Sequence, residues 1–490
     1  MLTAGVVTAT VGGAGVVATG IAGAADAGPA WAKCAAAPPE APPRVVCADL
    51  SVPADWAKPT GPAVTLKLAK LPATDPGHRI GALFVNPGGP GASGLEMVYR
   101  AESTLSAGLL ERYDLVSFDP RGQAASNPVV CDVDKVQAQA AALNPKNEKQ
   151  YQALRYANRA LGDNCRERTG PVAEHVDSVA VARDMDAIRS AIGEAQVTFY
   201  GVSYGTVIGQ EYAELFPGRL RGMVLDSVLD HSANLWQLQA DGAVAIEESF
   251  TRFARWCART TDCSLHDEDV LSYFDKLYAR AEAGELVHDP GTPDEWVTTG
   301  DYLIGMIMLY MREPAAWFDL ADALRAEGAA GSPKPAVRRA VEQTRMGYLA
   351  VLCQDFSFDT HGYAQFDRMK SDLARLAPHT RRNTNTWSWL ASCQNWPRGA
   401  QNPPHRLQAA KQLPPILLTN SRYDVATPYQ SAQSVAAQLP NATLLTYDGV
   451  GHADYVLDPC SRQAIDTYLL SGRMPKKGTH CPAVFPVERH

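Results

Sequence analysis

The clearest hydrophobic pattern in this chain is a short apolar run that leads directly into a segment with helical periodicity. Residues 197–200 predict a buried strand, and apolar side chains recur at helical spacing over 207–215, before Pro217 and Gly218 end the pattern. The junction, residues 201–205, reads Gly-Val-Ser-Tyr-Gly. A strand that ends in Gly-x-Ser-x-Gly and continues as a helix predicts a sharp turn that exposes the serine hydroxyl.

Further apolar runs of strand length predict a sheet around this junction. They cover residues 83–85, 221–225, 415–419 and 443–447, and a helical pattern over 179–188 separates two of the predicted strands. Strands that alternate with helices indicate a mostly parallel sheet flanked by helices. Together with the serine turn, this order predicts an α/β-hydrolase fold.

A serine nucleophile needs a histidine base and a carboxylate that orients the base. In this fold they follow the serine in the order acid, then histidine, each on a loop after a later strand. Asp424 follows the strand 415–419, and His452 closes the glycine-flanked loop after 443–447. We therefore predict a triad of Ser203, Asp424 and His452. Asp226, directly after the strand 221–225, is the second choice for the acid.

The oxyanion of such a reaction needs backbone N–H donors. Tyr204, the residue after the nucleophile, is expected to supply one, and Gly89 in the glycine-rich loop 86–94 the other. A phosphate-binding loop is the alternative for this segment. It is disfavoured because no Lys-Ser or Lys-Thr follows the glycines.

The spacing of these landmarks predicts the domain organisation. Residues 28–230 and 401–490 are assigned to the two parts of the α/β-hydrolase core. The long stretch 231–400 separates the serine from the acid, and it shows helical periodicity over 250–256 and 302–310. It is predicted to form a mainly helical cap over the site.

Five segments, taken together, resemble the secreted actinobacterial tripeptidyl aminopeptidases, which are relatives of the proline iminopeptidases. They are residues 86–91 (NPGGPG), 117–122 (SFDPRG), the serine turn at 201–205, 424–428 (DVATP) and 449–452 (GVGH). Residues 123–126 (QAAS) depart from the family pattern. The resemblance implies a serine exopeptidase that releases short peptides, tripeptides in particular, from free N-termini. An esterase or lipase-like hydrolase with the same triad is the alternative, and a non-catalytic binding protein on this scaffold is a third.

An aminopeptidase must also hold the substrate's α-ammonium group, which requires a carboxylate facing the site. The candidates are Glu247 and Glu248 in the cap and Asp355 beside Cys353. Asp355 is preferred because Cys-x-Asp in this region resembles the family pattern.

Composition and charge limit the classes of partner that we expect for this protein. The net charge of −8 offers no basic surface for nucleic acid. Residues 1–27 are rich in small and apolar residues and end in small-x-small sites, although they lack a basic start, and this indicates a secretory signal peptide. We expect an extracellular enzyme that acts on peptides or small proteins, with neither a cofactor nor a stable membrane anchor.

Ten cysteines in an exported chain indicate five disulfides. The chain has neither C-x-x-C nor H-E-x-x-H, so a metal site is disfavoured. Several connectivities remain open, but spacing suggests nearest-neighbour pairing and the family resemblance supports the same set. The suggested pairs are Cys34–Cys47, Cys131–Cys165, Cys257–Cys263, Cys353–Cys393 and Cys460–Cys481.

Overall fold

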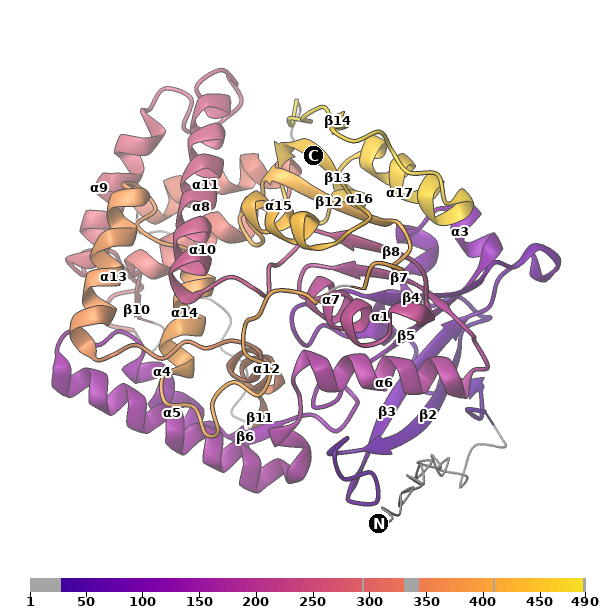
Figure 1. The fold of residues 1–490 in the computed structure, drawn as a ribbon. Helices are drawn as coiled ribbons and strands as arrows, with labels where there is room; N and C mark the ends of the chain where they lie inside the picture. The colour runs from indigo at the N-terminus through magenta and orange to yellow at the C-terminus, as the bar shows by residue number, and fades with distance from the viewer. Residues whose placement is uncertain (1–27, 293–294, 330–342, 409, 488–490) are drawn as a thin grey trace, which may run out of the picture.

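The structure is a computed structural model that describes residues 28–292, 295–329, 343–408 and 410–487. The predicted signal peptide, residues 1–27, lies outside the described residues. In the part that is described, a ten-stranded sheet runs through the molecule (Figure 1). Its strands, in spatial order, are β1 (Ala32–Lys33), β2 (Val46–Pro53), β3 (Ala63–Leu71), β5 (Tyr113–Phe118), β4 (Gly81–Asn86), β7 (Val197–Val202), β8 (Leu220–Asp226), β12 (Ile416–Tyr423), β13 (Ala442–Val450) and β14 (His480–Cys481).

The pairing of neighbouring strands changes once along the sheet, from antiparallel to parallel. From β1 to β5 each strand is antiparallel to its neighbour, and from β5 to β14 every pair is parallel. The mostly parallel sheet with flanking helices confirms the predicted α/β-hydrolase fold. Because parallel strands carry their carboxyl ends at one edge, the loops after β4, β7, β12 and β13 lie along the same edge.

Helices cover both faces of the sheet, and alternate strand residues point to opposite sides. One face buries Leu83 and Val85 against α1 (Gly94–Tyr99), α3 (Ala107–Arg112) and α17 (Pro459–Ser471). The other face buries Phe84 and Phe199 against α6 (Ser178–Ala191), α7 (Gly205–Leu215) and α15 (Tyr429–Gln438).

A helical region lies beside the carboxyl edge of the sheet (Figure 1). Residues 231–400 supply α8 (Leu235–Cys257), α9 (Val270–Glu282), α10 (Gly300–Tyr310), α11 (Trp317–Gly328), α12 (Gly347–Asp355), α13 (Tyr363–Leu376) and α14 (Thr384–Cys393). Short strands β9 (Val287–His288) and β10 (Trp296–Val297) pair within it. Buried residues between 246 and 324 form a second hydrophobic cluster, which also includes Val425 and Val450, whereas α12 and α14 share the cluster of the sheet.

An earlier segment also joins the helical region. Helices α4 (Val133–Ala142) and α5 (Glu148–Thr169) precede the serine in the chain, yet α5 packs against α13 and α14. Strand β6 (Val130–Asp132) pairs with β11 (Gln343–Arg345), which ties the two segments together. The helical region is therefore built from two parts of the chain, and sequence spacing indicated only the second.

Two strands are longer than their hydrophobic patterns. The run 415–419 becomes β12, which continues to Tyr423, and 443–447 becomes β13, which continues to Val450. The extra residues are paired along the two strands, with an irregularity between Ser421 and Tyr423. Polar residues such as Asn420 and Ser421 are buried there because they hydrogen-bond to neighbouring loops.

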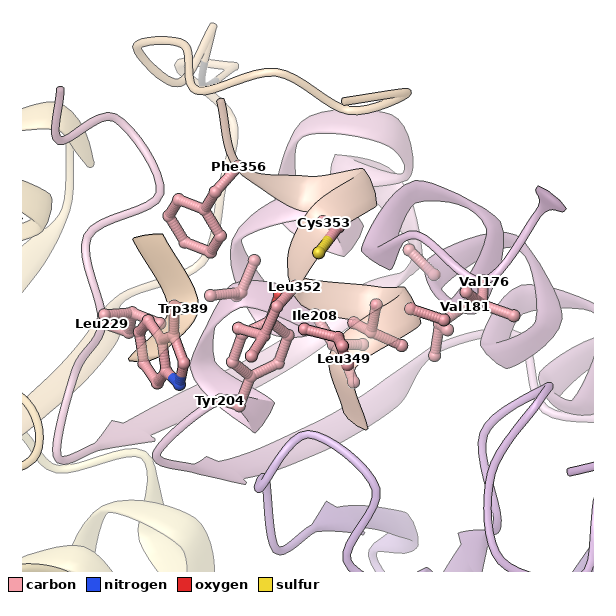
Figure 2. Packing of buried hydrophobic residues seen from close by; sticks show 14 of the residues in the cluster. Val176, Val181, Tyr204, Ile208, Leu229, Leu349, Leu352, Cys353, Phe356 and Trp389 are labelled. Atoms are coloured by element: carbon pink, nitrogen blue, oxygen red, sulfur yellow. The ribbon is translucent and has the colours of Figure 1, made fainter. Parts of the chain in front are cut away.

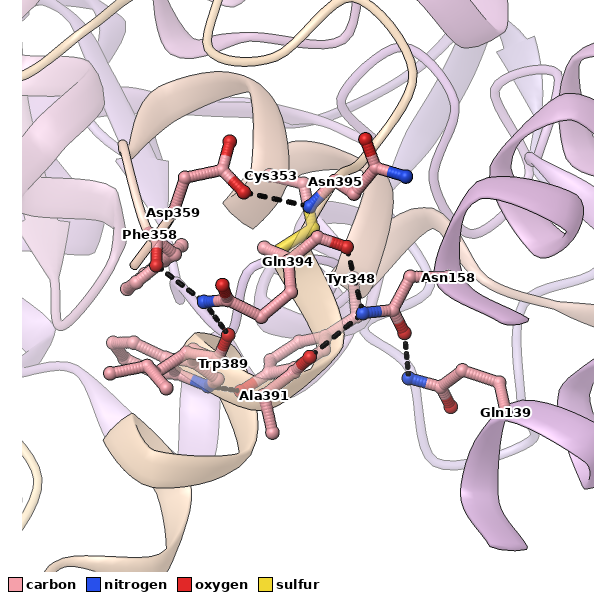
Figure 3. Close-up of a disulfide and its surroundings, with 12 residues drawn as sticks. Gln139, Asn158, Tyr348, Cys353, Phe358, Asp359, Trp389, Ala391, Gln394 and Asn395 are labelled. Carbon is pink, nitrogen blue, oxygen red and sulfur yellow. Dashed lines mark hydrogen bonds between the residues drawn. A yellow bond between two sulfur atoms is a disulfide. The ribbon is translucent and has the colours of Figure 1, made fainter. Parts of the chain in front are cut away.

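All ten cysteines form disulfides, in the five pairs suggested by spacing. Cys353–Cys393 joins α12 to α14, and the residue after Cys393 extends this link (Figure 3). The Gln394 amide donates to the carbonyls of Phe358 and Leu390, and Asn158 on α5 donates to the Gln394 carbonyl. The disulfide therefore lies at a junction of three helices. Across the described ranges, we find no helix that is both long and apolar enough to span a membrane.

Candidate functional site

Ser203 lies at the tip of the turn between β7 and α7. Its φ is +56°, a left-handed conformation that a non-glycine residue rarely adopts. The Ser203 N–H donates to the Asp226 carbonyl at the end of β8, over 2.9 Å, which fixes the turn to the next strand. Helix α7 begins two residues later, so its N-terminal N–H groups point toward the serine.

The two glycines of the motif supply space rather than a left-handed φ. A Cβ at Gly201 would lie 2.6 Å from the Gly205 carbonyl oxygen, and a Cβ at Gly205 would lie 2.7 Å from the Asn86 carbonyl oxygen. Neither site could hold a side chain without moving backbone. The left-handed residue of the turn is the serine itself.

Asp424 and His452 lie side by side, on the loops after β12 and β13. His452 Nδ1 is 2.8 Å from Asp424 Oδ2 and 3.0 Å from Oδ1. Because an ionised carboxylate can only accept, Nδ1 carries the proton and Nε2 keeps its lone pair. Burial alone would raise the pKa of Asp424, but His452 and the N–H groups of Ala426 and Thr427 outweigh it and lower that pKa below its usual value.

Asp226, the second choice for the acid, has other partners. Its carboxylate accepts from the Tyr200 hydroxyl at 2.8 Å, from the Thr419 hydroxyl at 3.1 Å, and from the N–H groups of Asp454 and Tyr455 at 2.8 and 3.1 Å. These bonds hold the segment just after His452. In this geometry Asp226 positions the histidine loop, and Asp424 is the carboxylate that contacts the histidine.

The glycine-rich loop lies against the serine turn. A Cβ at Gly88 would come within 2.7 Å of the Tyr204 nitrogen, so only glycine allows this approach. The Gly88 N–H donates to Asn86 Oδ1 at 2.9 Å and is therefore occupied. Within the described ranges, the N–H groups of Gly89 and Tyr204 have no acceptor. These are the two donors expected from the sequence, and a substrate oxyanion could accept from both.

The helical region contacts both the histidine and the acid loops. The His452 N–H donates to the Arg312 carbonyl, just after α10, over 2.9 Å. The Asn383 side chain, at the start of α14, donates to the Val425 carbonyl beside Asp424 over 2.8 Å. The positions of the acid and the base therefore depend on segments from the predicted cap.

Asp355, the preferred ligand for a substrate amine, is in the wrong place for that role. It is fully buried, and its carboxylate accepts from Ser178 N–H and Oγ, from the Tyr204 hydroxyl and from the Asn402 amide, all within 3.1 Å. Figure 2 shows Tyr204 in the same group of buried side chains as Leu349 and Leu352 of α12, the helix that ends at Asp355. Burial raises the pKa of Asp355 to about 6. The prediction for Asp355 is wrong because its carboxylate anchors the serine turn.

Of the two glutamates predicted as amine ligands, Glu247 and Glu248, only Glu248 is exposed to solvent. Glu247 is buried, and it accepts from the backbone of His379 and Thr380 and from the Thr380 hydroxyl, so its predicted role as an amine ligand is also wrong. Glu248 is exposed on α8. The next residue along, Ser249, donates to the Tyr423 carbonyl, which places this turn of α8 beside the loop that carries Asp424.

Two groups of described side chains offer metal-ligand atoms: Glu211, His231 and His405, and Asp458 with Cys460 and Cys481. The two cysteines are bonded to each other. In the first group, His231 Nδ1 lies 3.1 Å from Glu211 and its Nε2 donates to the Asp355 carbonyl. Burial lowers the pKa of His231, but Glu211 and Asp355 outweigh it and raise that pKa to about 9. A protonated imidazole has no free lone pair, so this group is an ion pair at neutral pH.

Sequence reasoning missed the side chains that hold the site. Thr427 donates from Oγ1 to Asp424 Oδ2 at 2.9 Å and lies 3.4 Å from His452 Nδ1. Asp119 accepts from Ser93 Oγ at 2.6 Å and so fixes the end of the glycine-rich loop. Both residues belong to motifs that the sequence displays, at 424–428 and 117–122. The sequence alone does not show that these two side chains lie close to the triad in three dimensions.

Comparisons with known proteins agree with this geometry. The family profile described as "TAP-like protein" matches residues 380–481, and the profile "alpha/beta hydrolase fold" matches residues 81–287. The chain is 32% identical to a tripeptidyl aminopeptidase of Streptomyces lividans, over 94% of this chain and 87% of the relative. It is 30% identical to the serine protease Hip1 of Mycobacterium tuberculosis, over 92% and 90%. It is also 29% identical to carboxylesterase B of that organism, over 89% and 86%.

Proposed function

Because this chain belongs to the tripeptidyl aminopeptidase-like family of α/β hydrolases, we propose that it is a secreted serine exopeptidase. It would release short peptides, tripeptides in particular, from the free N-termini of peptides or small proteins. The observation that carries the chemistry is the contact of His452 Nδ1 with Asp424, which is 2.8 Å long. The φ of +56° at Ser203 supports the role of this turn as the nucleophile turn. Five disulfides support a location outside the reducing cytoplasm.

The proposed reaction proceeds through an acyl-enzyme. His452 Nε2 accepts the proton of Ser203 Oγ as the oxygen attacks the scissile carbonyl carbon. The N–H groups of Gly89 and Tyr204 stabilise the resulting oxyanion. His452 then passes the proton to the leaving amine nitrogen as the C–N bond breaks. A water molecule, deprotonated by the same histidine, releases the acyl part from Ser203.

Preference for peptides is supported by the relatives named tripeptidyl aminopeptidase and serine protease, each aligned over at least 92% of this chain. A free N-terminus requires a carboxylate near the acyl part of the substrate. We propose Glu248 for this role, because it is the exposed one of the two candidate glutamates, Glu247 and Glu248, and its neighbour Ser249 contacts the Tyr423 carbonyl.

The test compares one chromogenic tripeptide substrate with its N-acetylated form. A charge-assisted hydrogen bond is worth about 1.5–3 kcal/mol, so acetylation should lower kcat/KM at least about tenfold. Glu248→Gln should reduce this penalty to about twofold or less by slowing only the free substrate. Ser203→Ala should abolish activity on both substrates.

Glu285→Gln is the matched control, because Glu285 is an exposed cap glutamate that pairs with Arg280 rather than lying beside the acid loop. It should keep the full acetylation penalty. Equal wild-type rates on the two substrates would contradict the exopeptidase proposal. A penalty that Glu248→Gln leaves unchanged would keep the activity and reject Glu248 as the amine ligand.

An esterase remains the second candidate, because the carboxylesterase B relative aligns over 89% of this chain. The same triad hydrolyses esters through the same acyl-enzyme. Simple acyl esters without an amine, assayed beside the tripeptide substrate, separate the two. An esterase should prefer the simple esters and show no dependence on a free amine.

A further inference from the structure

A cavity of about 490 Å³ opens directly beside the candidate catalytic residues. Its wall includes Val202, which precedes Ser203, Pro87 of the glycine-rich loop, and Ala453, which follows His452. The serine turn, the glycine-rich loop and the histidine loop therefore all border it. The volume lies within the range that proteins use for small ligands and side chains.

The floor of the cavity is aromatic and offers no free hydroxyl. Tyr200 and Tyr455 lie there with ring centroids 5.8 Å apart. The Tyr200 hydroxyl donates to Asp226, and the Tyr455 hydroxyl donates to Asp466. Both hydroxyls are thus occupied away from the cavity, and both rings are almost completely buried. An apolar group in the cavity would contact fixed ring surfaces.

The remaining lining favours an uncharged occupant. Leu105 and Met97 form an apolar side. The rim carries one exposed residue of each sign, Glu96 and Arg100, so its net charge is zero. Selection by charge is therefore weak, and selection by size and hydrophobicity is strong.

The lining residues come from 87–105, 200–202 and 453–456, and none comes from residues 231–400. The proposed amine ligand Glu248 lies on α8, in the helical region, so the acyl part of the substrate extends toward the cap. The leaving amine must lie next to His452, which protonates it. The segment after His452 forms part of this cavity.

We propose that this cavity is the subsite for the first residue after the scissile bond, and that it selects a large apolar side chain there. This inference rests on the proposed function, because it takes the acyl part to be bound under the cap. The enzyme would then cleave fastest before residues such as leucine and phenylalanine in the leaving peptide.

The test uses one tripeptide acyl group joined to glycinamide, aspartyl amide, leucinamide and phenylalaninamide. Wild type should show a kcat/KM about tenfold higher for the leucine and phenylalanine substrates than for the other two. Met97→Trp fills the cavity and should remove most of this preference. Deacylation should be unchanged, because the leaving group has departed by then.

Met474→Trp is the matched control. Met474 is also a half-buried methionine in the same hydrophobic cluster as Met97, but it does not line this cavity. It should keep the wild-type preference. Met97→Ala enlarges the cavity and should extend the preference to tryptophan in the leaving peptide. This variant tests the proposal if Met97→Trp does not fold.

Equal wild-type rates on the glycine and phenylalanine substrates would overturn the proposal. A Met97→Trp variant that slows deacylation as much as acylation would also overturn it, because that result would place the acyl part of the substrate in the cavity.

If no peptide is cleaved, the proposed peptidase function fails, and acetate esters then test separately whether the cavity binds the leaving group. The 2-phenylethyl ester should then react about tenfold faster than the ethyl ester in wild type but not in Met97→Trp, and equal wild-type rates would overturn the subsite.

Discussion

Some residues at the site contact the proposed catalytic histidine, and others hold the loops that carry it. The two buried aspartates at the ends of adjacent strands, Asp424 and Asp226, are an example of each. Asp424 contacts His452, whereas Asp226 accepts four hydrogen bonds from Tyr200, Thr419 and the backbone after the histidine. Asp424→Asn should lower kcat by about 10⁴-fold, because an amide in that place favours the wrong histidine tautomer. Asp226→Asn should lower kcat less than about a hundredfold, through a displaced loop.

Steady-state kinetics on both variants, with circular dichroism to verify folding, checks this prediction. A severe loss in Asp226→Asn together with a mild one in Asp424→Asn would show that the acid has been misassigned.

At the scale of elements, Asp355 couples α12 to the serine turn, since its carboxylate accepts from the Tyr204 hydroxyl at the start of α7. Asp355→Asn replaces one acceptor oxygen by a donor and should destabilise the fold by about 1–3 kcal/mol. It should also lower kcat about tenfold with little change in KM, because the Tyr204 N–H moves. The ratio of rates on free and acetylated substrates should not change. If Asp355 bound the substrate amine instead, that ratio would fall toward one.

A second coupling between elements is sensitive to pH. His231, after β8, pairs with Glu211 on α7, and its pKa is raised to about 9. A raised histidine pKa contributes stability that is complete below the unfolded value of about 6.5 and is lost as pH rises through about 9. The loss should amount to about 3 kcal/mol. Urea unfolding at pH 6.5 and 9.5 should show it in wild type.

The His231→Gln variant supplies the comparison for that measurement. Its stability should change much less between the two pH values, since glutamine does not titrate. A wild-type loss that persists in the variant would assign the pH dependence to other groups.

At the scale of the whole molecule, the disulfides close loops of very different length. Cys353–Cys393 closes a loop with a sequence separation of 40, and Cys257–Cys263 one of 6. In the chain-entropy description, removing the longer link should cost about 4 kcal/mol and the shorter one about 2 kcal/mol. Thermal unfolding of the two paired Cys→Ser variants measures the difference. An equal loss of stability in both would show that local packing, and not loop closure, determines the effect.

The sequence by itself determined the core strands, the expected triad and the disulfide pairing of this protein. Apolar runs of strand length placed β4, β7, β8, β12 and β13, because buried parallel strands are continuously hydrophobic. The Gly-x-Ser-x-Gly turn indicated Ser203, and the order of elements indicated Asp424 and His452, because each expected residue lies directly after a recognisable strand. Nearest-neighbour cysteine spacing matched the disulfides, since each pair joins segments that are close in the chain.

Only the tertiary structure decided which carboxylates are free and which are occupied. Asp355, Glu247 and Glu248 look alike in sequence, but the first two are buried and accept bonds from segments distant in the chain. The same is true of α5, whose packing against α13 and α14 joins two separate parts of the chain. A hydrophobic pattern reports burial along one element. It carries no information on which distant donor meets a given carboxylate, because that depends on how the elements pack in three dimensions.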